Sequence, residues 1–248
     1  MEHKIPVEYL EEIKKLKQEV YEANLKLVDY KLVIHTWGNV SGITKDRKFM
    51  VIKPSGVSYN ELSADDMVVT DLENNIYESH YNPSVDAPTH TLLYKANPEM
   101  KGIVHTHSKN AVAFAQAGKD IPCYGTTHAD NFYGPVPCAR ALTPQEIDGE
   151  YEHNTGLVIL ETFKNRNIDF KATPATLVKE HGPFAWSFKS PMDAVNMALT
   201  LETVAEMAIK TSIVANLQSH PAQEALVTRH YLRKHGKNAT YGQKSKKH

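Results

Sequence analysis

The segment Gly102-Ile-Val-His-Thr-His-Ser108 places two histidines two residues apart at the end of an apolar run. In an extended strand, residues i and i+2 project from the same face, so both imidazoles can reach one metal ion from one side. A bare His-x-His pattern is more often a pair of surface or core histidines. A metal site would therefore require a fold that brings further ligands to the end of this strand.

Other residues in the chain could supply those ligands. A second predicted strand ends at His181, before the stop signal Gly182-Pro183, and open α/β folds gather ligands at strand ends. Asp86 follows a loop at the start of a predicted helix, where capping the helix is its alternative role. Three imidazoles and one carboxylate are a standard set for a divalent transition metal, and zinc matches it best. By spacing alone, the metal site and a structural role stay equally open.

Apolar spacing predicts one α/β domain in which short strands alternate irregularly with helices. Helices are predicted over 6–30, 88–95, 110–117, 143–165 and 190–217, and strands over 32–35, 49–52, 67–70, 102–107 and 176–181. Residues 36–42 and 125–134 are expected to be polar connections. The segment from His230 is too polar for the core, and residues 244–248 are expected to be a disordered tail.

Composition excludes several classes of function. Lys and Arg number 28 against 29 Asp and Glu, so no net field favours nucleic acid or an acidic membrane surface. No apolar run approaches the roughly 20 residues that span a bilayer, and the N-terminus lacks a signal sequence, so we expect a cytoplasmic protein. Cys123 and Cys138 fit neither a disulfide framework nor a CxxC metal knuckle, and we expect reduced thiols.

The segment Lys53-Pro-Ser-Gly56 directly follows a predicted strand. A glycine lets backbone N–H groups converge, while serine and lysine add a hydroxyl donor and a positive charge. This combination suits an anion such as phosphate. Pro-Ser-Gly is also an ordinary turn, so the pattern alone favours the turn.

Seven segments, in order along almost the whole chain, resemble the class II aldolase/adducin-like family, and within it the L-ribulose-5-phosphate 4-epimerases. They are Trp37-Gly-Asn-Val-Ser41, Ile52-Lys-Pro-Ser-Gly-Val57, Asp86-x-Pro-Thr-His90, Gly102-Ile-Val-His-Thr-His-Ser108, Gly125-Thr-Thr-His-Ala-Asp130, His181-Gly-Pro-Phe-Ala-Trp186 and His230-Tyr-Leu-Arg-Lys-His-Gly236. The His-x-His and Lys-Pro-Ser-Gly elements are shared across the superfamily. The segments ending at Asp130 and Gly236 point to the epimerase branch.

The resemblance implies a single α/β/α domain over residues 1–243 with a largely antiparallel central sheet. It also implies a homotetramer with one zinc ion per subunit, although another divalent transition metal is possible. Carried over by position, the metal ligands are His105, His107 and His181, with Asp86 at the acidic position of the metal site.

The resemblance also implies a pocket for the phosphate of a phosphorylated ketopentose. Its residues map onto Gly38, Asn39, Ser55, Gly56 and Ser84, with Lys53 nearby. At Val85 the chain departs from the family, which usually has a second serine there. Because a hydrogen bond to a charged group contributes roughly 1.5–3 kcal/mol, this change is expected to weaken phosphate binding without removing the pocket.

Asp130 and Tyr241 fall where the epimerases keep an acid/base pair, and in the family the tyrosine reaches the site from a neighbouring subunit. Without the resemblance, Asp130 would be a turn residue and Tyr241 a tail aromatic. The implied reaction interconverts L-ribulose 5-phosphate and D-xylulose 5-phosphate by cleaving and re-forming the C3–C4 bond. His128 and His230 are either supporting groups or structural residues.

Two alternatives remain at this point. A class II sugar-phosphate aldolase would use the same metal and release the aldehyde, but such enzymes typically have glutamate at the position of Asp86. A non-catalytic adducin-like module would not need the metal ligands, and all three histidines are present. The sequence does not choose between a role in arabinose and a role in ascorbate catabolism.

Overall fold

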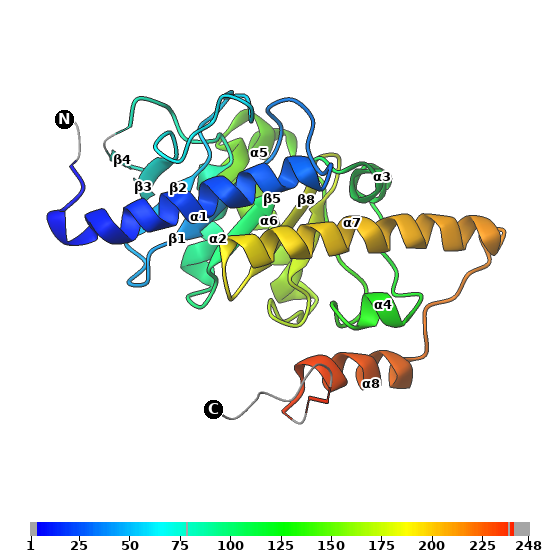
Figure 1. Cartoon of the computed structure of the whole chain (residues 1–248). Coiled ribbons are helices and arrows are strands. Elements are labelled where there is room, and N and C mark those ends of the chain that lie inside the picture. The colour runs from blue at the N-terminus through cyan, green and yellow to red at the C-terminus, as the bar shows by residue number, and fades with distance from the viewer. Residues whose placement is uncertain (1–3, 78, 238, 241–248) are drawn as a thin grey trace.

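The computed structural model describes residues 4–77, 79–237 and 239–240. An eight-stranded sheet runs through it in the order β4-β3-β2-β1-β5-β8-β7-β6, and every neighbouring pair is antiparallel except β6 and β7 (Figure 1). The strands are β1 (Asn39–Ile43), β2 (Phe49–Ile52), β3 (Val68–Asp71), β4 (Ile76–Tyr77), β5 (Gly102–His105), β6 (Cys138–Ala139), β7 (Ala175–Val178) and β8 (Gly182–Ser187). This confirms the predicted α/β fold with a largely antiparallel sheet.

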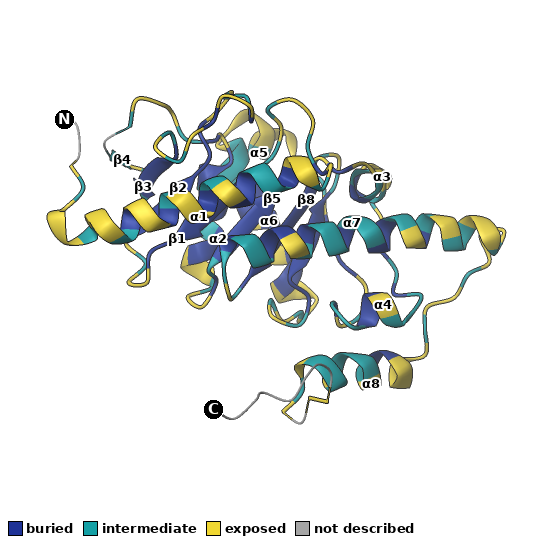
Figure 2. Cartoon of the chain, in the orientation of Figure 1, coloured by how far each residue is buried: buried dark blue, intermediate teal, exposed yellow. Residues whose placement is uncertain are grey.

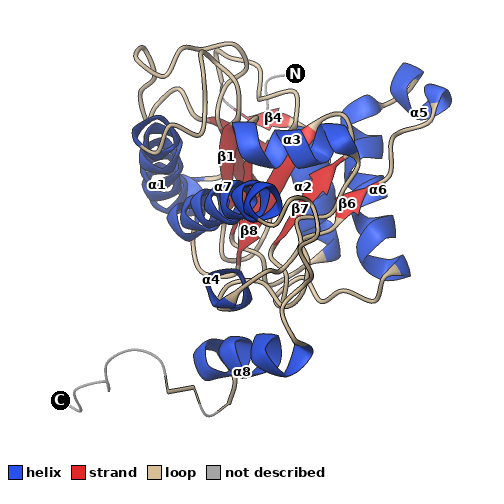
Figure 3. Cartoon of the chain, turned by 90° about the vertical axis from the view of Figure 1, so that its right-hand side faces the viewer, coloured by secondary structure: helices blue, strands red, loops and turns tan. Residues whose placement is uncertain are grey.

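Helices cover both faces of the sheet (Figure 3). They are α1 (Leu10–Asp29), which follows the 3-10 turn η1 (Val7–Tyr9), α2 (Ala87–Ala96), α3 (Lys109–Ala117), α4 (Thr126–Ala129), α5 (Pro144–Asp148), α6 (Tyr151–Asn165), α7 (Pro191–Val214) and α8 (Glu224–His235). Helices α1, α3 and α7 lie on one face, and α2 and α6 lie on the other. The domain is therefore an α/β/α sandwich.

Strand β5 shows how the sequence produces these layers. Successive side chains of a strand point to opposite faces. Ile103 packs in the core under α2 and α6, with Leu93 and Phe163, whereas Val104 packs under α1, α3 and α7, with Leu201. Figure 2 shows the central strands buried throughout and the outer helix faces exposed. Covering on both faces is the reason the segment has an unbroken apolar run before His105.

Most of the predicted helices are confirmed, together with their end signals. The helix predicted over 6–30 is η1 and α1, and those over 88–95 and 110–117 are α2 and α3. Gly118 ends α3 in the left-handed region, at φ 62°. Thr143 and Glu146 form the capping box of α5, and the Ser190 hydroxyl accepts from the Asp193 N–H at the start of α7.

The strand predicted over 32–35 is wrong. This segment is an irregular connection after α1, with His35 in a turn at φ 56°, and the Leu32 N–H donates to the Leu27 carbonyl at the helix end. The strand forms instead at β1, in a stretch expected to be a polar connection. All five β1 residues are buried. The small polar side chains are tolerated because Asn39 and Ser41 find hydrogen-bond partners inside the fold.

The predicted stop at Gly182-Pro183 is also wrong. Strand β7 ends at Val178, a tight turn follows with Glu180 at φ 65°, and Gly182 begins the central strand β8. His181 therefore precedes a strand rather than ending one. Pro183 is tolerated near the start of β8, where its carbonyl still accepts the Thr106 N–H at 3.3 Å.

Three further differences concern helices. The helix predicted over 143–165 breaks at Gly149, between α5 and α6, whereas Gly156 lies inside α6 in close contact with Leu92 of α2. The expected loop 125–134 contains the four-residue helix α4. The polar segment around His230 is part of helix α8, of which only Val227 is buried, in a small cluster with Cys123 and Ala129.

The cysteines and the apolar content of the helices are two further subjects of prediction. Cys123 and Cys138 are free cysteines, as expected, and both are buried. None of the helices in the described ranges is long and apolar enough to cross a membrane. Residues 244–248 lie outside the described residues.

The contact between Gly102 and the start of α7 generates a prediction. A Cβ at Gly102 would lie 2.6 Å from the Pro191 Cα and 2.8 Å from the Ser190 carbonyl oxygen, so backbone would have to move. We expect Gly102→Ala to lower the free energy of unfolding by about 1–3 kcal/mol in urea denaturation. Gly125→Ala is the matched control, because a Cβ there has nothing within 4 Å. Equal stability of the two variants would contradict the prediction.

Candidate active site

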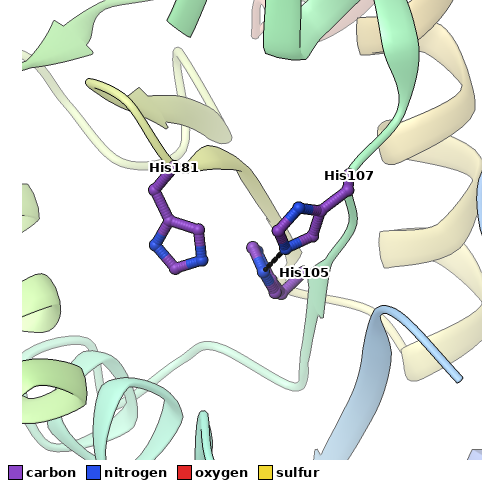
Figure 4. Close-up of side chains that lie close together, drawn as sticks. All are labelled: His105, His107 and His181. Carbon is purple, nitrogen blue, oxygen red and sulfur yellow. Dashed lines mark hydrogen bonds between the residues drawn. The ribbon is translucent and has the colours of Figure 1, made fainter. Parts of the chain in front are cut away.

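One edge of the sheet brings the predicted site residues together. Asn39 at the start of β1 pairs with His105 at the end of β5, and His105 pairs with Phe184 of β8. His107 follows β5 by two residues, and His181 directly precedes β8. Figure 4 shows the three imidazoles facing one another. One potential ligand nitrogen from each ring lies within 4.8 Å of the other two. The two Nε2 atoms of His105 and His107 are 3.0 Å apart.

The electrostatics of these histidines fit a divalent metal. Burial lowers the pKa of His105 and of His181 to about 3, and it lowers the pKa of His107 as well. Neutral imidazoles keep the lone pair that a metal ion needs. The Nδ1–H of His105 can donate to the Pro183 carbonyl at 3.0 Å, which leaves Nε2 as the ligand atom. The three residues therefore fit a metal site, as predicted from the sequence.

Asp86 lies beside these histidines, and it lines a pocket that His105, His107 and His181 also line. It occupies the N-cap position of α2, but its side chain makes no capping hydrogen bond. Its Oδ2 instead accepts from the Asn39 amide at 2.7 Å and faces the Ser84 hydroxyl at 3.4 Å. Among the described residues, the group within 4.8 Å consists of the three histidines without Asp86. Direct ligation by Asp86 therefore stays a prediction.

A pocket of about 340 Å³ adjoins the histidines. The substrate-binding and metal-site residues predicted from the sequence all line it: Gly38, Asn39, Lys53, Ser55, Gly56, Ser84, Val85, Asp86, His105, His107 and His181. Gly38 has φ 79°, and a Cβ there would lie 2.9 Å from the His105 carbonyl oxygen. The close approach of these two chain segments thus requires glycine.

Lys53 gives the pocket a buried cationic group. Its side chain is 1% exposed, and its ammonium donates to the Val57 carbonyl at 2.8 Å and lies over the ring of Tyr59. Burial lowers its pKa to about 8. The partners identified in the described part of the chain are carbonyl oxygens and a ring, none of them negatively charged. An anion in the pocket would therefore stabilise the charged form of Lys53.

Sequence reasoning gave no site role to five residues that line the pocket: Thr36, Trp37, Pro54, Tyr151 and Glu152. Trp37 is 50% exposed, and its ring lies 6.0 Å from that of His107. Its position next to Gly38 in a matched motif could have identified it. No sequence signal could have found Tyr151, because its place depends on where the helix after Thr143 breaks.

Asp130 does not line this pocket. It ends α4, where its carboxylate accepts from Arg233 at 2.9 Å and from His230 at 3.0 Å. Burial raises its pKa, but these two hydrogen bonds, together with the charge interactions with the same two residues, outweigh burial and hold the pKa below its ordinary value. A single chain thus brings the histidines and Lys53 to one pocket without Asp130. Tyr241, the other predicted acid/base residue, lies outside the described residues.

His128 and His230 differ in their contacts. The Nε2–H of His128 donates to the Gly134 carbonyl at 2.8 Å, and burial lowers its pKa to about 4, as for an internal structural residue. His230 contacts the carboxylate of Asp130 and so holds that residue in place.

Comparisons with known proteins agree with the site. The family model of the class II aldolase and adducin N-terminal domain matches residues 18–209. The chain belongs to this family. It is 59% identical, over 235 residues, to the "Probable L-ribulose-5-phosphate 4-epimerase UlaF" of Mycoplasma pneumoniae. The aligned residues cover 94% of this chain and 97% of the relative. The chain is thus a near-full-length homologue of that class II aldolase family protein.

Solved structures support the class II aldolase fold. An L-fuculose 1-phosphate aldolase superposes with a TM-score of 0.72 at 21% identity, covering 87% of this chain and 94% of its own. A sugar-phosphate aldolase from Thermotoga maritima gives 0.63 at 18% identity, covering 85% and 99%. At these identities the likeness shows the fold alone.

The lowered pKa values of the histidines predict how metal binding depends on pH. Three imidazoles with an ordinary pKa near 6.5 would lose roughly a thousandfold in zinc affinity between about pH 7.5 and about pH 5.5, because protons compete for each lone pair. Since the pKa of His105 and of His181 is about 3, we expect the loss to stay within roughly tenfold. Calorimetric zinc titrations at the two pH values measure it. A thousandfold loss would show ordinary imidazoles.

Proposed function

We propose that this chain is a metal-dependent L-ribulose-5-phosphate 4-epimerase, which interconverts L-ribulose 5-phosphate and D-xylulose 5-phosphate. The observation that carries the proposal is the 59% identity, over nearly the full length, with a relative of that name. The pocket supports it, because three imidazoles of lowered pKa and a buried lysine line one cavity. A phosphorylated sugar that binds a metal through its oxygens needs both groups.

The metal, which we propose to be zinc, would be held by His105, His107 and His181, with Asp86 beside them. When bound, it supplies Lewis-acid polarisation of the substrate carbonyl. The chain itself keeps the three imidazoles neutral and their rings in place. The hydrogen bond from the Asn39 amide holds the carboxylate of Asp86 toward the same cavity.

The phosphate would occupy the part of the pocket near Lys53. The ammonium of Lys53 and the hydroxyls of Ser55 and Ser84 are suitable donors, and all three residues line the cavity. Val85 lies beside them with its side chain 61% exposed, and it offers no hydroxyl. Anchoring by the phosphate matters, because the fragment that carries it must turn over before it reacts again.

The proposed reaction cleaves the C3–C4 bond, because the hydrogen on C4 is not acidic enough for direct removal. The C4 hydroxyl loses its proton, the C4–oxygen bond becomes a carbonyl, and the electron pair of C3–C4 passes to C3. The resulting glycolaldehyde phosphate turns over and re-forms the bond through its other face, which inverts C4. Asp130 and Tyr241 would take and return the proton at the C4 oxygen on opposite faces.

Because Asp130 lies outside the pocket of its own chain, its proposed role requires a second copy. We propose a homotetramer in which α4 and α8 of one subunit complete the pocket of a neighbour. The ion pair with Arg233 and the hydrogen bond from His230 would keep Asp130 ionised, which is the form that can accept a proton. This arrangement would separate the metal and phosphate groups from the groups that move the proton.

Incubation of the zinc-loaded protein with L-ribulose 5-phosphate tests the proposed activity. We expect D-xylulose 5-phosphate to accumulate, as followed by NMR, because the aldehyde fragment stays anchored until the bond re-forms. His181→Ala should lose both bound zinc and turnover. Accumulation of free glycolaldehyde phosphate would identify an aldolase instead. A protein that purifies without metal and gains none on addition of zinc would contradict both enzymes and favour a non-catalytic module.

Asp130→Asn tests the proposed acid/base residue. We expect it to keep its zinc and to lose turnover by roughly 10²–10⁴-fold, which is the usual contribution of a positioned acid or base. Asp120→Asn is the matched control, since Asp120 is another ion-paired aspartate, bound to Arg166 outside the pocket.

Mixed oligomers extend this test. Co-expression of Asp130→Asn with His181→Ala should restore part of the activity, because some pockets then combine an intact metal group with an intact Asp130. Mixed oligomers that stay inactive would contradict the sharing of a pocket between subunits. Loss of zinc in Asp130→Asn would assign that residue to the metal site.

A further inference from the structure

A metal-binding imidazole is held by the partner of its other ring nitrogen. That partner fixes which nitrogen carries the proton and how the ring is turned. For His105 the partner is the Pro183 carbonyl, which can only accept, so the Nδ1 of His105 must donate. For His181 the corresponding atom is the phenol oxygen of Tyr151, 3.3 Å from Nδ1. Sequence reasoning gave Tyr151 no role.

The start of helix α6 holds Tyr151 in this position. Its N–H donates to the Gly149 carbonyl at 3.0 Å, and its carbonyl accepts the Thr155 hydroxyl at 2.9 Å. Its ring lies 5.8 Å from the His181 ring, at an interplanar angle of 34°. The break between α5 and α6 thus places the phenol of Tyr151, held by its backbone hydrogen bonds, next to His181.

The chemistry of the pair decides the direction of the hydrogen bond. Figure 4 shows one ring nitrogen of His181 turned toward His105. Since Nδ1 contacts Tyr151, Nε2 is the nitrogen left for a metal. If the phenol donated to Nδ1, Nε2 would carry the proton and have no free lone pair. In the form that binds metal, Nδ1–H must therefore donate to the phenol oxygen.

We propose that Tyr151 is a positioning residue, which accepts the Nδ1–H of His181 and so presents Nε2 of His181 to the metal. The inference rests on the proposed metal site and is independent of the roles of Asp130 and Tyr241. Two of the ligands are then held differently, because a backbone carbonyl holds the ring of His105 and a side chain holds the ring of His181. The occupancy of the third ligand position would thus depend on one phenol.

Tyr151→Phe tests this role, because it keeps the ring and removes only the oxygen. We expect the dissociation constant for zinc, measured by competition with a chromophoric chelator, to rise about 10- to 100-fold. The visible spectrum of the cobalt-substituted protein should change as well, because the His181 ring loses the hydrogen bond that fixes its orientation toward the metal. Tyr30→Phe is the matched control: its phenol also makes a hydrogen bond, to Asn196 at 3.2 Å, but it does not line the pocket.

An unchanged zinc dissociation constant and cobalt spectrum in Tyr151→Phe would overturn the inference. Urea unfolding of the metal-free variant shows whether its fold is intact, and histidine ¹⁵N NMR of the unchanged protein gives a measurement that does not depend on the variant. We expect His181 in the metal-free protein to be protonated mainly at Nδ1, and protonation mainly at Nε2 would also overturn it. If the unchanged protein binds no zinc, the proposed function fails, and that result is distinct from a failure of Tyr151→Phe alone.

Discussion

The antiparallel pairing of β1, β5 and β8 is the constraint on which the pocket depends. The pairs Asn39–His105 and His105–Phe184 fix the ends of these strands level with one another. Because β8 begins directly after His181, the same register brings the third imidazole to the first two. A slip of β5 by one residue would turn His105 to the other face of the sheet. The two packed cores prevent such a slip, since it would also exchange Ile103 and Val104 between them.

Burial sets the protonation of the groups that lie at these strand ends. The same exclusion of water that lowers the pKa of His105 and of His181 to about 3 lowers that of Lys53 only to about 8, so the pocket combines neutral imidazoles with a lysine that stays mostly charged at neutral pH. A buried polar group needs a partner. The hydrogen bond from Asn39 to Asp86 meets this need for the carboxylate. A metal and a phosphate would satisfy the groups that the chain leaves available.

The residues proposed to bind the metal and the phosphate lie apart from Asp130, the residue proposed to move the proton. The histidines and Lys53 line one pocket of a single chain, whereas Asp130 lies outside that pocket, directly after α4, where two residues of α8 hold it. Proteins named as aldolases share the fold with this chain at about one fifth sequence identity. One scaffold that holds a metal and a phosphate can support different reactions when the groups around its opening change.

The sequence by itself determined the residue types of the site, the strand β5 and the ends of helices that carry local signals, such as the capping box at Thr143. These features depend on neighbouring residues, so the sequence contains them directly. Only the tertiary structure decided that β1 forms from small polar residues and that His181 precedes a strand. It also decided that Tyr151 reaches His181. These outcomes depend on contacts between distant segments, where burial on both faces outweighs the local preference of Asn39, Ser41 and Pro183.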